Sequence, residues 1–224
     1  MSMKKQPKDN TPWYTLQTGF YHFTPNSDSD GTSVPVLPTL YSNLVDAADL
    51  ENHMLCKHTK SDRTDLVWIR NSNMIEGICN LEEDHRCLDS WRWFSQPEVK
   101  LTKANVLNLH EQVMIELYPQ VAGKVRTCKV WVGPSLKMLP KEVTIQFPKW
   151  FKRYGKASTE IEIVEAHVMF EHIHPFVDGN GRVGRMVMNK QFVVAGRPPK
   201  MVRYEDRWEY YGLFGYREAF SEVN

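Results

Sequence analysis

The stretch IEIVEAHVMFEHIHPFVDGNGRVGRMVMNKQFVV, residues 161–194, holds two apolar segments separated by a short polar break. The apolar residues of 161–173 lie on nearly every face of a helical projection, which is typical of a helix buried at the centre of a domain. Pro175 cannot continue that helix, and the apolar residues of 183–194 predict a second helix. The stretch therefore predicts two core helices joined by a polar loop.

Other segments predict more helices and one hairpin. Apolar residues recur at three- and four-residue spacings in 40–54, 66–78 and 101–117, and Thr102 is a suitable N-cap for the third of these segments. The alternating residues of 125–132 predict a strand that enters a turn at Gly133-Pro134, and 143–147 predict its partner strand. Residues 1–38 lack a steady period and predict an irregular arm, so we expect a mainly α domain over 39–224 with a small β-hairpin.

Composition excludes several classes of function. The 28 basic and 27 acidic residues leave a net charge of +1, which favours neither nucleic acid nor an anionic membrane as partner. Seven tryptophans without a basic groove argue against single-strand binding. Four cysteines without a CxxC pair, no signal peptide and no apolar run of membrane-spanning length predict a soluble protein of the cytoplasm with reduced thiols. Delivery of the protein into a host cell is left open.

The polar loop carries residue types suited to phosphate chemistry. Pro175 biases His174 away from helical geometry, and an imidazole at such a break can accept a proton near neutral pH. Gly179 and Gly181 flank Asn180, and they allow successive backbone N–H groups to point into one concavity at the start of the next helix. These features predict a general base beside a phosphate-binding nest.

Charged side chains add to this nest. Arg182 and Arg185 are three residues apart and are expected to lie on one helix face, where both can meet a polyphosphate. Asp178 offers a hard oxygen for Mg²⁺ bound to phosphates, whereas Phe176 is expected to anchor the loop in the core. The loop therefore predicts a site for a metal-bound nucleotide.

The segment HPFVDGNGRVGR, residues 174–185, resembles the Fic motif HPFxDGNGRxGR at every specified position. The resemblance covers about residues 65–215, and it includes the flap pattern GxxRxxxVxIG, which Gly123, Arg126 and the residues up to Gly133 resemble. It implies a mainly α Fic fold with a β-hairpin flap, and an enzyme that moves AMP from ATP to a Ser, Thr or Tyr hydroxyl of a protein. By the same resemblance, the flap holds the target by strand addition through Thr127, Cys128, Lys129, Val130, Trp131 and Val132.

The resemblance also implies the roles of the loop residues. His174 would deprotonate the target hydroxyl, and Asp178 would bind Mg²⁺. The phosphates of ATP would be held by Gly179, Asn180, Gly181, Arg182 and Arg185. Doc-like kinases of the superfamily have a lysine where this chain has Gly181, so glycine favours nucleotidyl transfer over phosphorylation.

An inhibitory element is expected upstream. The segment SNMIEG, residues 72–77, resembles the family motif [ST]xxxE[GN], with Ser72, Glu76 and Gly77 at its specified positions. It falls on the helix expected at about 65–78. A Glu76 carboxylate that pairs with Arg185 would occupy the arginine that receives the γ-phosphate, and the enzyme would be autoinhibited.

Several alternatives remain beside this interpretation. The same Glu76 could orient a water that removes AMP from a modified protein, and a nucleotide-binding module without turnover is the rival outside the enzyme class. His167 and His172 are expected in the core or in support of the site rather than in a metal cluster. The aromatic stripe around Tyr210 is expected to be core rather than an adenine stack. The target protein, the preferred donor nucleotide and a homodimer are left open.

Overall fold

The computed structural model describes residues 45–46, 60–132 and 135–214. The predicted arm at 1–38 and the turn Gly133-Pro134 lie outside the described residues. Most of the helix predicted at 40–54 lies outside them too, and its two described residues, Val45–Asp46, form a strand and not a helix. Within the described residues, the chain forms seven helices and two pairs of short strands, so the expected mainly α fold is confirmed. The helices are α1 (Lys60–Ile75), α2 (Leu81–Ser95), α3 (Lys103–Met114), α4 (Pro140–Tyr154), α5 (Glu160–Ile173), α6 (Asn180–Val194) and α7 (Arg207–Gly212), and the strands are β1 (Val45–Asp46), β2 (Trp131–Val132), β3 (Ser135–Leu136) and β4 (Lys200–Met201).

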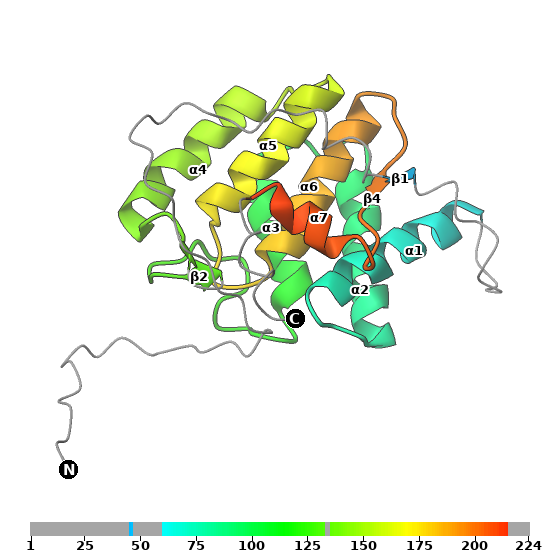
Figure 1. Cartoon of the computed structure of the whole chain (residues 1–224), viewed down its shortest axis with the longest axis horizontal. Coiled ribbons are helices and arrows are strands. Elements are labelled where there is room, and N and C mark those ends of the chain that lie inside the picture. Colours follow the sequence, from blue (N-terminus) through cyan, green and yellow to red (C-terminus); the bar gives the residue numbers. More distant parts are fainter. Residues whose placement is uncertain (1–44, 47–59, 133–134, 215–224) are drawn as a thin grey trace, which may run out of the picture.

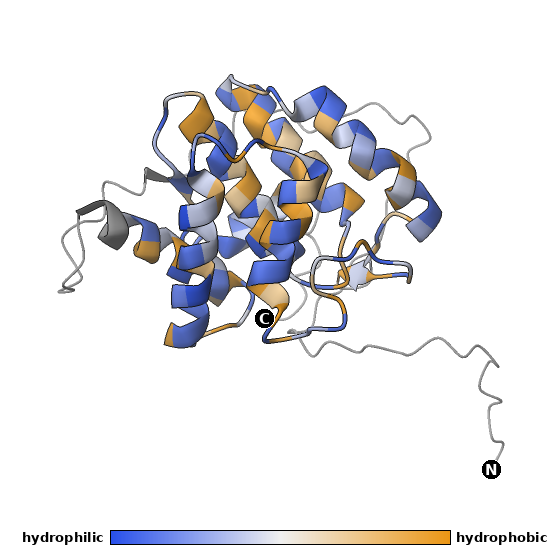
Figure 2. Cartoon of the chain, turned by 180° about the vertical axis from the view of Figure 1, so that it is seen from behind, coloured by the Kyte–Doolittle hydropathy of each residue, from blue (hydrophilic) through white to orange (hydrophobic). Residues whose placement is uncertain are grey.

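Helix α6 lies between the pair α4 and α5 and the group formed by α1, α2 and α3. It packs against α5, which also contacts α4, and it contacts α1, α2 and α3 on its other sides (Figure 1). Most apolar residues of these helices are buried, and hydrophobic and hydrophilic positions alternate along their ribbons (Figure 2). The eleven residues from Arg182 to Phe192 are all buried, and so is Asn180, so the N-terminus of α6 starts inside the molecule.

Local sequence signals place several helix ends. The side chain of Thr102 accepts a hydrogen bond from the backbone N–H of Asn105, which confirms the predicted N-cap of α3. At the start of α5, Thr159 and Glu162 form a reciprocal capping box. The helix predicted at about 65–78 begins earlier, at Lys60, and ends at Ile75, before Gly77 with its φ of 75°.

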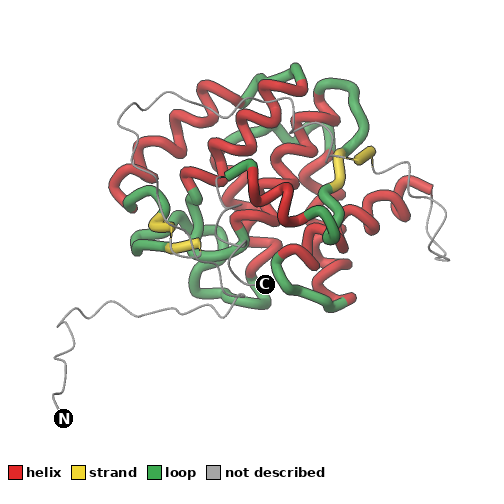
Figure 3. The backbone as a smooth tube through the Cα atoms, in the orientation of Figure 1, coloured by secondary structure: helices red, strands yellow, loops and turns green. Residues whose placement is uncertain are grey.

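The predicted hairpin exists, but its second strand was wrong. Strand β2 pairs antiparallel with β3, so that Trp131 lies opposite Leu136, and regular strand geometry is limited to Trp131–Val132 rather than 125–132. Residues 143–147 belong to helix α4. Val143 and Phe147 are fully buried while Ile145 between them is 54% exposed, so the apolar period is four residues and not two. Figure 3 shows the short strands of this hairpin among loops at one end of the helices.

Helix α2 was not predicted from the sequence. Its first turns are charged, from Glu82 to Arg86, and they obscure the apolar face that follows. That face consists of Cys87, Leu88, Trp91 and Phe94, all buried at helical spacing. The edge of the Trp68 ring of α1 meets the ring of Trp91 with centroids 5.1 Å apart, which joins α1 to the core beside α6.

The helical period of α4 has a measurable consequence. We expect Phe147→Ala to lower the free energy of unfolding by about 3–5 kcal/mol, because this buried ring packs on Phe151, Phe170 and Phe176. The matched control Ile145→Ala should change it by less than about 0.5 kcal/mol, since Ile145 is exposed. Urea unfolding followed by tryptophan fluorescence measures both values. Equal losses for the two variants would contradict the packing of α4.

Candidate active site

His174 stands at the break between α5 and the polar loop. Its backbone is left-handed, with φ 50° and ψ 65°, and it is the single non-glycine residue with positive φ in the described part of the chain. Its N–H still donates to the carbonyl of Phe170 at 2.9 Å, so it caps α5 before Pro175 turns the chain away. The imidazole is thereby held at a defined point, and its side chain is 13% exposed.

The loop after His174 is closed by a side chain. Asn180 Oδ1 accepts from the backbone N–H of Phe176 at 2.9 Å, and its Nδ2 donates to the carbonyl of the same residue at 3.0 Å. Asn180 is buried, and both polar atoms of its side-chain amide bind the backbone of the loop. At the start of α6 its backbone N–H is the group that can bind an anion. Phe176 is buried as expected from the sequence.

His110 of α3 supports the loop from below. Its ring stacks on Phe176 with centroids 3.8 Å apart and an interplanar angle of 9°. Its Nδ1 accepts from the N–H of Gly123 at 2.9 Å, so the proton is on Nε2, which lies 3.0 Å from the carbonyl of Asp178. Burial lowers the pKa of His110 to about 4, which keeps this arrangement neutral and fixed.

The two arginines of α6 have different neighbours. Arg182 is buried beneath the loop, with NH2 3.0 Å from the sulfur of Met114 and 3.8 Å from Oδ2 of Asp178. Its Nε and NH1 have no hydrogen-bond partner among the described residues. Arg185 faces α1 instead. Both arginines were expected to meet one anion. The structure instead places Arg182 as a buried positive charge under the loop and Arg185 beside α1.

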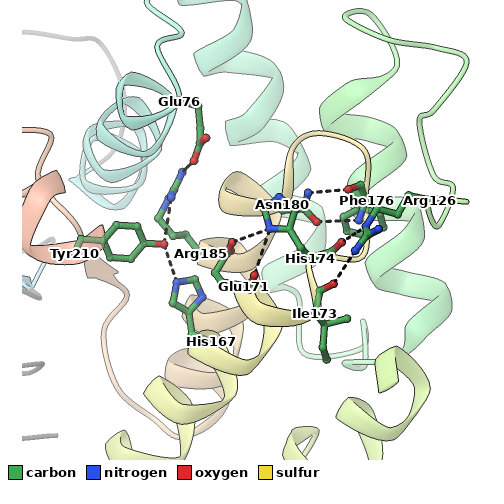
Figure 4. Close-up of polar contacts among 10 residues, drawn as sticks. All are labelled: Glu76, Arg126, His167, Glu171, Ile173, His174, Phe176, Asn180, Arg185 and Tyr210. Carbon is green, nitrogen blue, oxygen red and sulfur yellow. Dashed lines mark hydrogen bonds and ion pairs between the residues drawn. The ribbon is translucent and has the colours of Figure 1, made fainter. Parts of the chain in front are cut away.

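Arg185 is engaged on all its nitrogens. NH2 forms an ion pair with Oε1 of Glu76 at 2.6 Å and donates to the carbonyl of Ser72 at 2.9 Å, while Nε donates to Oγ of Ser72 at 2.7 Å. NH1 lies 3.3 Å from the hydroxyl of Tyr210 (Figure 4). The arginine is 3% exposed and the glutamate 29%. The structure thus brings Ser72, Glu76 and Arg185 together across more than a hundred residues of sequence.

Glu76 also lies over the first turn of α6. A Cβ placed on Gly181 would overlap its Oε1 and would come within 3.0 Å of Arg185 NH1. The positive end of a helix dipole and its free N–H groups favour an anion at this place. The carboxylate therefore occupies a position suited to an anionic ligand, and glycine at 181 makes room for it.

Burial dominates the electrostatics around His174. It lowers the pKa of His174 below its ordinary value, although the nearby carboxylate of Glu171 opposes this shift. Oε2 of Glu171 lies 3.7 Å from Nδ1 of His174. The imidazole is therefore neutral at physiological pH, and a neutral imidazole can accept a proton.

Tyr210 and Glu171 are polar groups of the site that sequence reasoning missed. The Tyr210 hydroxyl lies between NH1 of Arg185 and Nε2 of His167, 2.8 Å from the latter. His167 is buried as expected, whereas His172 is exposed, which corrects its expected place in the core. No local sequence signal distinguishes Tyr210 from its aromatic neighbours in α7. Its partners come from α5 and α6.

Arg126 ties the flap to the loop. Its buried guanidinium donates to the carbonyls of His174 at 2.6 Å, Cys128 at 2.8 Å and Met138, and lies 3.4 Å from that of Ile173. Beyond it, residues 127, 129 and 131 are exposed and 128, 130 and 132 are partly buried, which is an extended alternation. The N–H of Lys137 donates to the carbonyl of Val130 at 3.0 Å and extends the hairpin beyond its two paired residues. The flap residues therefore lie beside the end of α5.

Asp178 is the single carboxylate placed on the loop itself. Its side chain is 25% exposed. Within the described residues no group of three or more His, Cys, Asp or Glu side chains is arranged to hold a metal. Mg²⁺ in nucleotide sites commonly takes one or two carboxylates together with substrate phosphates and waters. The residues present thus fit a metal that arrives with a nucleotide, rather than a metal held by protein ligands alone.

Comparison with known proteins agrees with this arrangement. Residues 100–192 match the model of the Fic/DOC family. Protein adenylyltransferase Fic of Nematostella vectensis is 31% identical over 121 residues, which cover 52% of this chain and 28% of that protein. The protein of the same name from Drosophila mojavensis is 34% identical over 118 residues, 50% of this chain and 23% of that protein. The chain thus spans about a quarter of the length of these curated relatives.

Solved structures show the same fold. A Fic domain containing signaling protein from Bacteroides thetaiotaomicron aligns with a TM-score of 0.61 at 20% identity, covering 80% of each chain. Fic-1 from C. elegans aligns with a TM-score of 0.56 at 21% identity, covering 78% of this chain and 64% of that one. The part of the chain that the structure describes has no helix long and apolar enough to cross a membrane. The match over residues 100–192, the motif at 174–185 and the shared fold together make this part of the chain similar to the Fic domains of the Fic/DOC family.

Proposed function

We propose that this chain is a protein adenylyltransferase that moves AMP from ATP to a hydroxyl side chain of another protein. The observation that carries the proposal is the placement of a neutral His174 at the end of α5, a short loop away from the anion-favouring N-terminus of α6. The adenylyltransferase names of the curated relatives, which match half of this chain, support it.

The proposed reaction is an in-line displacement at the α-phosphorus of ATP. His174 takes the proton from the hydroxyl of a Ser, Thr or Tyr residue of the target, and the hydroxyl oxygen forms a bond to the α-phosphorus. The bond from this phosphorus to the oxygen bridging the α- and β-phosphates breaks, and pyrophosphate leaves with that oxygen. The target keeps AMP as a phosphodiester, and the proton on His174 returns to solvent.

The α6 N-terminus supplies the groups that hold the phosphates. The backbone N–H groups of Gly179, Asn180 and Gly181 and the positive end of the helix dipole favour an anion. Arg182 adds positive charge from beneath the loop, and Arg185 would bind the γ-phosphate once Glu76 has moved. Asp178 would hold Mg²⁺ together with phosphate oxygens, and the metal would neutralise charge on the departing pyrophosphate.

We infer that the free enzyme is autoinhibited by α1 and the turn after it. The ion pair between Glu76 and Arg185 fills the place of an anionic ligand, because Glu76 lies directly over Gly181. Ser72 binds the same arginine through both its hydroxyl and its carbonyl. A γ-phosphate must therefore displace a carboxylate before ATP can lie in a productive orientation.

Removal of AMP is the second candidate activity. It is favoured by the 29% exposure of Glu76, because a partly exposed carboxylate at the phosphate site can orient a water for attack on phosphorus. Loss of label from a modified protein that requires Glu76 would distinguish this activity from AMP transfer. Tight ATP binding without product in any variant would instead identify a nucleotide-binding module.

The inhibitory pair predicts activation by mutation. We expect Glu76→Gly to raise self-labelling from ATP labelled at the α-phosphate by at least about tenfold, equivalent to about 1.4 kcal/mol, because Arg185 becomes available to the γ-phosphate. The label is measured on gels and located by mass spectrometry. Glu98→Gly, which removes an exposed carboxylate from a comparable turn after α2, should label as slowly as the wild type. Adding His174→Ala to Glu76→Gly should abolish the label, and equal rates for Glu76→Gly and wild type would refute the inhibition.

The pH profile tests the proposed base. Because burial lowers the pKa of His174, its neutral form should persist below the ordinary histidine pKa of about 6.5. The rate of AMP transfer by Glu76→Gly should therefore stay on its plateau through neutral pH and fall only below about pH 6.5 as the ring becomes protonated. Rates between about pH 5 and 8 at saturating ATP measure this limb. A rate that falls already between pH 8 and 7 would require a base with a raised pKa, which these surroundings do not give His174.

A further inference from the structure

Glu171 is a buried carboxylate beside His174 that the proposed transfer has not used. It lies in the last turn of α5, three residues before His174, which caps that helix. Its Oε2 lies 3.7 Å from Nδ1 of His174, and its side chain is 9% exposed. Its Oε1 has no hydrogen-bond partner among the described residues. A Cβ on Gly184 would overlap this oxygen, so the glycine of α6 leaves room for the carboxylate.

A buried carboxylate is costly unless opposing charge or hydrogen-bond donors stabilise it. Burial alone would raise the pKa of Glu171, but the rings of His174 and His167 and the charge of Arg185 hold it well below its ordinary value. Other packed elements contribute groups as well. The titratable groups that interact with Glu171 or His174 are His167 and His172 on α5, Arg185 on α6, Tyr210 on α7, Lys137 after β3 and Arg126 before the flap. Glu171 is thus the anionic member of a mostly cationic or neutral group.

The acceptors on one side of the ring decide which nitrogen carries the proton. The carbonyl of Glu171 lies 3.3 Å from Nδ1 and can only accept a hydrogen bond. The carboxylate, another group that can only accept, lies on the same side of the ring, with Oε2 3.7 Å from Nδ1 and so beyond hydrogen-bond distance. Two acceptors at Nδ1 favour the tautomer with a proton there, which leaves the lone pair on Nε2. Figure 4 shows both contacts between Glu171 and the ring of His174.

We propose that Glu171 is a positioning residue for His174: it fixes the ring and its tautomer from the Nδ1 side, so that Nε2 is the nitrogen that accepts the target's proton. The proposal rests on the proposed AMP transfer and assigns a second residue to it. The carboxylate also stabilises the imidazolium that forms when His174 takes the proton. Loss of the negative charge should therefore make His174 a weaker base.

The kinetic test uses the active background. Glu76→Gly/Glu171→Gln keeps the size of the side chain and removes its charge, and we expect kcat to fall about 10- to 100-fold with little change in KM for ATP. The acidic limb of its rate profile should move to lower pH, because the carboxylate that raises the pKa of His174 is gone. Glu171→Asp should restore part of kcat. The matched control Glu165→Gln changes another carboxylate of α5, which binds Arg153 and Tyr154 away from His174, and should leave kcat unchanged.

A spectroscopic readout keeps this proposal separate from the proposed reaction. Nitrogen-15 NMR of the His174 ring in the otherwise unmodified protein, assigned with His174→Ala, should show a protonated Nδ1 and an unprotonated Nε2 without any nucleotide. Glu171→Gln keeps the backbone carbonyl at Nδ1 and removes only the charge, so the population of the Nε2-protonated tautomer should rise while the melting temperature remains within a few degrees of wild type. A wild-type ring protonated on Nε2, or an unchanged tautomer and pH limb in Glu171→Gln, would overturn the proposal. The expected tautomer in a protein without AMP transfer would leave the positioning role standing and remove the proposed reaction.

Discussion

The paired hydrogen bonds between the side chain of Asn180 and the backbone of Phe176 close the loop between α5 and α6, and the site is arranged around that closure. A chain that leaves a buried helix and enters another within six residues must satisfy its polar backbone groups inside the core. Asn180 does this for Phe176, and His110 does it for the carbonyl of Asp178. Arg126 collects the carbonyls at the end of α5. His174 and the N-terminus of α6 are consequently held in one rigid turn.

Arg185 has hydrogen-bond partners other than the inhibitory Glu76. Arg185 is almost fully buried and needs acceptors whether or not a nucleotide is present. Ser72 and Tyr210 hold its Nε and NH1, so the departure of Glu76 removes one partner and leaves the guanidinium oriented. Glu76 is the more exposed partner and can be solvated when it leaves. A γ-phosphate would therefore replace a carboxylate on a preformed site. The turn after α1, which carries Glu76, is the part that must rearrange.

Features that depend on a short stretch of sequence could be predicted, and features that depend on contacts between distant elements could not. The break at Pro175, the cap at Thr102 and the buried character of α5 are properties of short segments, and they were predicted. Residues 143–147 were misassigned because alternation over five residues fits both periods, and only burial of Phe147 against α5 and the loop decides for a helix. Glu171 and Tyr210 were missed because their roles arise from partners on other elements. Asn180 was expected at a phosphate, and its amide instead closes the loop.

The glycines of α6 show how the inhibitor and the base meet on one helix. Gly181 and Gly184 are one turn apart, and each lacks a Cβ where a carboxylate from another element approaches, Glu76 at the first and Glu171 at the second. Arg185 follows directly and acts on both, through an ion pair with Glu76 and as a charge that helps keep Glu171 ionised. A ligand that takes Arg185 from Glu76 therefore acts on a group that also influences the partner of His174. Arg185 is thus the one charged group that both the inhibitory carboxylate and the carboxylate beside His174 have as a neighbour among the described residues.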